Sequence, residues 1–173
     1  MQRIKLVSPD KAYMEQVLNY KKEFIENQED FAGSGGLRLT SDYDEWLTML
    51  VDNSCDATVR EGLVPASTYL AVTIEDNRLV GMIDIRHRLN DYLENFGGHI
   101  GYSIKRSERK QGYATEMLNL ALDVCKNLQI SPVLVTCDKE NLGSAKTIIN
   151  NGGQLINEVP EDYRITQRYH IHL

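Results

Sequence analysis

The residues best suited to do chemistry lie together near position 110, where a basic segment runs into a helix. Arg106, Arg109 and Lys110 precede Gly112 in the string RSERKQGYATEML. The first amides of a helix lack intrahelical acceptors and carry partial positive charge, so they can bind an anion such as a pyrophosphate. Gly112 and Ala114 are small where a larger side chain would block its approach. The alternatives are a solvated basic loop, or a turn that uses glycine only for its geometry.

The overall composition limits the kinds of partner. The chain has 173 residues, of which 42% are hydrophobic and 25% charged, with a net charge of −6. This composition is ordinary for a globular domain, and the negative charge argues against nucleic acid or an anionic membrane as a partner. No apolar stretch is long enough to span a bilayer. We therefore expect a single domain over residues 1–173 and a cytoplasmic protein.

The three cysteines fit this expectation. Cys55, Cys125 and Cys137 are widely spaced, without a CxxC pair or nearby histidines at zinc spacing. An odd number cannot all pair, so reduced thiols in the cytosol and no bound metal are the simplest prediction.

The first half of the chain predicts a strand, two helices and a hairpin. Alternation in QRIKLVS indicates a short strand, after which Ser8 and Pro9 are suited to begin a helix that ends near Asn27. Its predicted core stripe consists of Met14, Val17, Leu18, Lys21 and Ile25. A second helix is expected from Ser41, and two strands are expected on either side of a turn at Asp76 and Asn77.

The second half alternates strands with helices. HIGYSI predicts a strand, residues 114–128 carry a helical stripe, and the run VLVTC after Pro132 predicts a strand buried on both faces. A helix over 141–151 should end at Gly152 and Gly153, and two strands complete the chain. This order describes an α/β fold of the α+β type: a central mixed sheet with helices on both faces.

In this setting the strings HIGYSIKRSERKQGYATEML and CDKENLGSAK resemble the GNAT (N-acetyltransferase) superfamily. The likeness extends from about Leu79 to Gly153, and the first string resembles the branch whose fourth strand reads x-I-G-Y-x-I before an R-x-x-G-x-A loop. The resemblance implies a GNAT-like acyl-CoA N-acyltransferase fold. It also implies transfer of an acetyl group from acetyl-CoA to a primary amine, by direct attack in a ternary complex.

The resemblance also implies a cofactor site. The backbone of Tyr102, Ser103 and Ile104 would pair with the pantetheine arm, and the Ile104 amide would polarise the thioester carbonyl. Asn141 and Ser144 would bind the pantetheine or phosphate region, a role for Asn141 that can coexist with capping a helix. The pyrophosphate would be held by the loop and first helical turn, namely Arg109, Lys110, Gln111, Gly112, Tyr113, Ala114 and Thr115.

The catalytic groups are less determined by the pattern. Many relatives place a tyrosine on the last helix as acid to the leaving thiolate, but Ile148 stands there in this chain. We expect His99 to be the base, because imidazole titrates near neutrality and His99 begins the strand that should carry the thioester. A packing role is the alternative for His99, and Asp84 and Glu94 are further candidate bases. Packing roles are favoured for the other histidines, His87, His170 and His172.

Cys137 ends the buried strand and could in principle carry an acetyl group. No neighbouring group that would lower its thiol pKa is evident, so a role as a small buried side chain is favoured.

The resemblance leads us to expect a small-molecule or peptide amine as the acceptor. Its binding site should involve the first two helices, a mobile loop at Gly33–Gly36 and the segment Asn90–Gly98. A homodimer is possible. The alternative from a different functional class is a non-catalytic acyl-CoA-binding module. A nucleotide-phosphate-binding regulator is another, although the chain lacks a P-loop and a full G-x-G-x-x-G motif.

Overall fold

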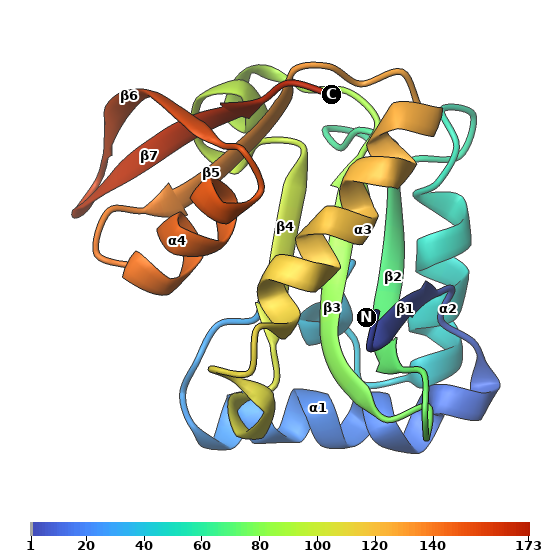
Figure 1. Ribbon diagram of the computed structural model, residues 1–173. Coiled ribbons are helices and arrows are strands. Elements are labelled where there is room, and N and C mark those ends of the chain that lie inside the picture. Colours follow the sequence, from blue (N-terminus) through green and yellow to red (C-terminus); the bar gives the residue numbers. More distant parts are fainter. Residues whose placement is uncertain (1) are drawn as a thin grey trace.

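The computed structural model describes residues 2–173 and contains a seven-stranded mixed sheet with helices on both faces (Figure 1). The strand order is β1-β2-β3-β4-β5-β7-β6, and β4–β5 is the parallel pair. The predicted mixed sheet is confirmed. The strands are β1 (Ile4–Val7), β2 (Ala66–Thr73), β3 (Leu79–Arg86), β4 (Ile100–Ile104), β5 (Val133–Asp138), β6 (Gln154–Glu161) and β7 (Arg164–Ile171). The α-helices are α1 (Met14–Glu26), α2 (Tyr43–Asp52), α3 (Tyr113–Asn127) and α4 (Leu142–Asn150).

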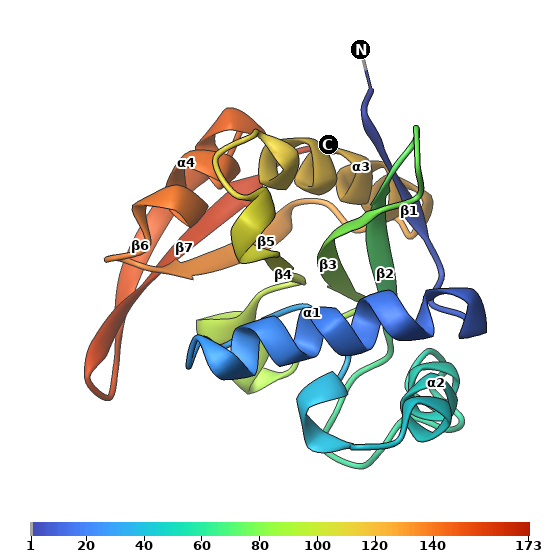
Figure 2. The ribbon, with the colours of Figure 1, turned by 90° about the horizontal axis from the view of Figure 1, so that it is seen from below.

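The sheet separates two hydrophobic cores. Helices α3 and α4 pack on one face, where Met117, Leu118 and Ile148 join the apolar side chains of β3, β4 and β5. Helices α1 and α2 lie on the other face, where Tyr20 and Trp46 are fully buried. Figure 2 shows the sheet between these two helical layers. None of the helices within residues 2–173 is long and apolar enough to cross a membrane.

The predicted face of the first helix is mostly wrong, since Val17 is the one buried residue of the predicted stripe. Val17, Tyr20 and Phe24 are buried, whereas Met14 and Ile25 of the predicted stripe are about half exposed, at 46% and 48%. The aromatic rings decide the orientation: Tyr20 and Phe24 pack against each other and against Phe31 in tilted and edge-on arrangements, and rings of that size contribute most to a core.

The predicted starts of the first two helices are also shifted. The first begins with a 3₁₀ turn, η1 (Lys11–Tyr13), which Asp10 caps by accepting from the Ala12 amide, instead of Ser8 and Pro9. Helix α2 begins two residues after Ser41 and is capped by Asp42.

The elements around the site match their predictions closely. The β2–β3 turn places Asn77 at φ 53°, as a tight turn requires. Met117, Leu118, Ala121 and Cys125 of the predicted α3 stripe are buried. Helix α4 ends before Gly152, which has φ 84°. Three short helical turns were not predicted, namely η2 (Leu37–Leu39), η3 (the π-helical Leu93–Gly97) and η4 (Arg106–Glu108).

Candidate active site

The site begins where two central strands separate. Five residues of β4 pair with β3, and six residues of β5 pair with β7. Between β4 and β5 the ladder contains the single pair Ile100–Val135. Beyond that pair the strands diverge, and a gap opens in the middle of the sheet (Figure 1).

The backbone of β4 offers unused hydrogen-bonding groups to this gap. The Arg86 amide bonds the His99 carbonyl, and the Lys105 amide bonds the Val80 carbonyl. Successive residues of a strand direct their backbone N–H and C=O groups to alternate sides, so Gly101 and Ser103 direct theirs at β3. Tyr102 and Ile104 therefore direct theirs into the gap. Of the three residues predicted to pair with pantetheine, Tyr102 and Ile104 have the required orientation and Ser103 does not.

A cavity of about 1150 Å³ passes through the gap and is lined by residues from both faces of the sheet. All the predicted cofactor residues line it except Gln111; His99 does not line it. The predicted residues on the α3 and α4 side include Tyr102, Gly112, Ala114, Thr115, Asn141 and Ser144. The opposite side is lined in part by the segment Asn90–Gly98, which was predicted to meet the acceptor and contributes Tyr92 and Phe96. It is also lined by residues that the sequence did not single out, among them Arg86, Gly101, Thr136 and Asp138.

The N-terminus of α3 opens into this cavity. Its cap residue, Gly112, lies in the left-handed region at φ 85° and has no side chain to cover the amides of the first turn. Lys110 also has a positive φ, 62°, so the chain turns twice within three residues before the helix begins. The result is an exposed ring of amides at the positive end of a helix of 15 residues, a geometry that suits a phosphate group.

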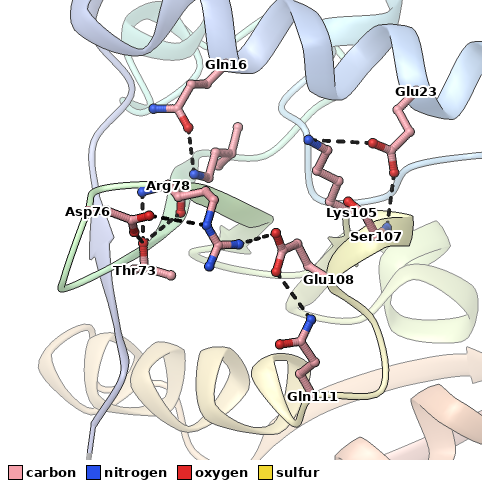
Figure 3. Close-up of polar contacts among 10 residues, drawn as sticks. Gln16, Glu23, Thr73, Asp76, Arg78, Lys105, Ser107, Glu108 and Gln111 are labelled. Carbon is pink, nitrogen blue, oxygen red and sulfur yellow. Dashed lines mark hydrogen bonds and ion pairs between the residues drawn. The ribbon is translucent and has the colours of Figure 1, made fainter.

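Ion pairs fix the loop before this helix (Figure 3). Arg78, in the β2–β3 turn, pairs with Glu108, and Glu108 also accepts from the Gln111 amide group. On the other side of the loop, Glu23 of α1 lies 3.6 Å from the Lys105 ammonium and accepts from the Ser107 amide at 3.3 Å. The loop is thus held by both the hairpin and α1, so its shape is set in advance.

The two loop arginines are engaged in ion pairs within the protein. Arg106 and Arg109 both pair with Glu29, and the Arg109 Nε donates to the Ile104 carbonyl at 3.0 Å. The hydrogen bond from Arg109 lowers the pKa of Glu29, and the positive charges of Arg109 and Arg106 lower it as well. Among the loop cations described, Lys110 has no ion-pair partner, so it is the one free to meet a phosphate.

A hydroxyl and thiol cluster lies on the α4 side of the gap. The Tyr102 and Ser144 hydroxyl groups are 2.8 Å apart. Burial raises the pKa of Tyr102 to about 12 and the pKa of Cys137 to about 11, so both groups are protonated at neutral pH. Ile148 is fully buried in the core and contributes no polar group. Asn141 caps α4 by accepting from the Ser144 amide and also lines the cavity, so its two predicted roles are compatible.

The position of His99 does not favour its predicted role as the base. Its Nδ1 accepts from the Leu134 amide at 2.9 Å, so the neutral ring carries its proton on Nε2 and has no free lone pair. The side chain is 9% exposed, and burial, followed by Arg86, lowers the pKa of His99 to about 4. His99 joins β4 to β5 just before the strands separate.

The other two candidate bases also lie outside the cavity lining. Asp84 is buried, which raises its pKa, and it is held by Thr68 at 2.7 Å and Arg86 at 3.4 Å. Glu94 lies in η3, where Arg168 bonds its backbone carbonyl.

The loop expected to be mobile is packed against β4. A side chain on Gly33 would clash with the Gly101 carbonyl, the Ser103 hydroxyl donates to Ala32, and the Trp46 indole donates to Ser34. The segment therefore forms a wall on the side of the gap opposite α3. Within residues 2–173 no group of three or more His, Cys, Asp or Glu side chains could hold a metal ion.

Comparison with known proteins identifies the fold. Residues 41–154 match the family model described as "Acetyltransferase (GNAT) domain". The chain belongs to the GNAT acetyltransferase family. No curated protein sequence matches the acetyltransferase.

Solved structures share this fold at low sequence identity. The ribosomal L7/L12 α-N-protein acetyltransferase RimL, in complex with coenzyme A joined to a cysteine by a disulfide, has a TM-score of 0.71 and 14% identity, over 100% of this chain and 96% of that one. A GNAT-family acetyltransferase from Bacillus anthracis has a TM-score of 0.65 and 18% identity, over 98% and 95%. The spermidine/spermine N-acetyltransferase SpeG from Vibrio cholerae has a TM-score of 0.63 and 14% identity, over 98% and 92%.

Proposed function

We propose that this acetyltransferase transfers an acetyl group from acetyl-CoA to a primary amine by direct attack in a ternary complex. The observation that carries the proposal is one cavity that passes through the β4–β5 gap. The α3 N-terminus lies on one side of this cavity, and the face of the sheet away from α3 lies on the other. Two reactants can then approach the same point from opposite faces of the sheet. Neither has to leave before the other binds.

The cofactor side fits acetyl-CoA in shape and charge. The amides that follow Gly112 and the Lys110 ammonium would take the pyrophosphate, as helix N-termini do. The backbone groups that Tyr102 and Ile104 direct into the gap would pair with the amides of the pantetheine arm, as when an extended ligand is added to a sheet edge. Because Arg109 already occupies the Ile104 carbonyl, the free donors are the Tyr102 and Ile104 N–H groups and the free acceptor is the Tyr102 carbonyl.

The chemical step needs a proton for the leaving thiolate, and the Tyr102–Ser144 hydroxyl pair is placed to supply it. Both residues line the cavity, and this pair would take over the role of the tyrosine that Ile148 replaces. Burial raises the pKa of Cys137, so this residue is a thiol and not the thiolate that an acetyl-cysteine mechanism would use. Direct attack by the amine is therefore favoured over a covalent intermediate.

Two structural neighbours suggest where to look for the acceptor. RimL is named for the α-amino group of a ribosomal protein, and SpeG for spermidine and spermine. A panel should therefore run from peptides with free N-termini to polyamines and small primary amines. Release of free thiol from acetyl-CoA with each amine measures turnover, and mass spectrometry of the amine detects the amide product.

A calorimetric titration separates this function from its alternatives. We expect coenzyme A to bind and ATP to bind at least ten-fold more weakly, because only coenzyme A has a pantetheine arm for the gap. Binding of coenzyme A with no thiol release across the whole panel would support the non-catalytic acyl-CoA-binding module. Equal affinity for ATP and coenzyme A would support a nucleotide-phosphate-binding regulator.

A further inference from the structure

The amine must reach the thioester from the face of the sheet that α3 does not cover. The helix N-terminus, the Tyr102–Ser144 pair and Cys137 lie on the α3 and α4 side of the gap. Residues of β5 alternate, so Thr136 and Asp138 face the other side, where Thr136 bonds the Phe96 carbonyl of η3 at 2.7 Å. The cavity continues there. An amine on this side therefore meets the side chains of Thr136 and Asp138, together with Arg86, whose charge is paired with Asp84.

Within the described chain, four carboxylate side chains line the cavity: Glu29, Asp30, Glu108 and Asp138. Three of them are already neutralised, because Glu29 holds Arg106 and Arg109, Asp30 holds Arg38, and Glu108 holds Arg78. Asp138 has no ion-pair partner among residues 2–173. It is therefore the cavity carboxylate whose charge is available to a cationic substrate.

The side chain of Asp138 is also oriented. Its Oδ1 accepts from the Glu140 amide at 2.8 Å, in the turn that leads from β5 into α4. This hydrogen bond engages Oδ1 and leaves Oδ2 available to a ligand in the cavity. The residue follows Cys137 directly, so it lies at the part of β5 where the thiol end of the cofactor is expected.

The charged groups around Asp138 are few. Arg164 of β7 also lines the cavity but already pairs with Glu161 at 2.8 Å, and Thr166, opposite Asp138 in the β5–β7 ladder, bonds Glu161 as well. Cys137 is the neighbouring titratable group on β5. Burial raises the pKa of Cys137 to about 11, and the charge of Asp138 raises it further in the same direction. The charges of Arg164 and Asp138 interact, but the Arg164 guanidinium pairs with Glu161, so an ammonium group entering here would find a carboxylate with no ion-pair partner among residues 2–173.

We propose that Asp138 binds the acceptor as its ammonium ion and is the general base of the reaction. The inference rests on the proposed function. Asp138 takes one proton from R–NH₃⁺, directly or through a water. The neutral nitrogen then attacks the thioester carbon, an N–C bond forms and the C–S bond breaks. The Tyr102–Ser144 pair gives a proton to the leaving thiolate and takes up the second nitrogen proton in its place. Asp138 then releases its proton to solvent.

Asp138→Asn tests this role while keeping the turn intact. Asparagine retains an Oδ1 that can accept from the Glu140 amide, but it has no basic oxygen and no charge. At pH 7 we expect kcat/KM for the amine to fall by about 10²–10⁴, the usual effect of removing a positioned base. The Kd for coenzyme A should stay within about two-fold of wild type, because no cofactor contact is lost. The melting temperature should stay within about 1 °C of wild type. Glu140→Gln is the matched control, since it removes a nearby exposed carboxylate that does not line the cavity, and it should leave kcat/KM unchanged.

The pH profile separates a base from a residue that only shapes the cavity. In Asp138→Asn, log kcat/KM should rise with pH with a slope of about one, because solvent then supplies the neutral amine. The difference in kcat/KM between the variant and wild type should become smaller as the pH rises toward the pKa of the amine. An active wild type with an equally active Asp138→Asn variant, or with a deficit of the same size at every pH, would overturn the role of Asp138. A wild type silent on the whole panel counts against the proposed function instead.

Discussion

Replacing Gly112 with alanine tests whether the left-handed turn before α3 forms the pyrophosphate site. At φ 85° an alanine is strained by about 1–2 kcal/mol, the cost of the left-handed region for an L-residue. Its Cβ would lie 3.3 Å from the end of the Arg3 side chain, which is flexible and can move away. Within the protein itself the methyl group therefore acts through backbone strain and not through a clash.

The strain can be relieved only if the turn changes its φ, and that change redirects the amides of Tyr113, Ala114 and Thr115. If the full 1–2 kcal/mol is taken from binding, the Kd for coenzyme A should rise about 5- to 30-fold. Isothermal titration calorimetry measures the Kd, and thermal denaturation measures stability. Any strain that remains should lower the melting temperature by about 2–8 °C, at roughly 2–4 °C for each kcal/mol in a chain of this size.

Gly62→Ala is the matched control. Gly62 has nearly the same φ, 83°, with open space around the position of a Cβ, and it does not line the cavity. This variant should lose stability without losing affinity for coenzyme A. Wild-type affinity in a folded Gly112→Ala variant would refute the reasoning, because the turn would then not shape the site. Equal loss of affinity in both variants would also refute it, by showing that strain anywhere in the fold is enough.

Two further predictions concern residues that the sequence singled out. His99→Gln should lower stability by about 1–3 kcal/mol, because the buried Leu134 amide loses its ring acceptor. The variant should keep turnover within a few-fold of wild type, and its pH profile should match that of wild type near pH 6.5. A 100-fold loss of turnover, together with the disappearance of an acidic limb that wild type shows near pH 6.5, would restore His99 as the base. Cys137→Ala should keep turnover within a few-fold, and wild type incubated with acetyl-CoA alone should gain no acetyl mass. A stable acetyl group on Cys137 that an added amine removes would show a covalent route.

The fold was predictable where each element carries its own periodicity. HIGYSI alternates and became β4, and the stripe of α3 keeps a period near 3.6, because one face of each meets a single continuous core. Helix α1 was harder. Its sequence offers two apolar faces, and the choice between them depends on Phe31 and Trp46, which come from outside the helix. Local pattern does not contain that information.

The candidate site shows the same division between local and long-range information. Gly112 could be predicted because a strand, a glycine turn and a helix start are all local features. The partner of Arg106 and Arg109 could not, since Glu29 lies 77 and 80 residues away in the sequence. A basic cluster in sequence is therefore a weaker sign of an anion site than it looks. Within the described loop, ion pairs use both arginines and leave Lys110 as the free cation.

The choice of base depends on which lone pairs and charges are already engaged. His99 has the more suitable unperturbed pKa, yet its one free lone pair is used by the Leu134 amide that fastens β4 to β5. Asp138 lines the cavity, and the ion pairs of the described chain leave its charge available at the mouth of the gap. The alternation of VLVTCD already places Asp138 on the face opposite Cys137. What the sequence lacked was the pairing of every other cavity carboxylate with an arginine, and only that pairing makes Asp138 stand out as the group an ammonium would seek.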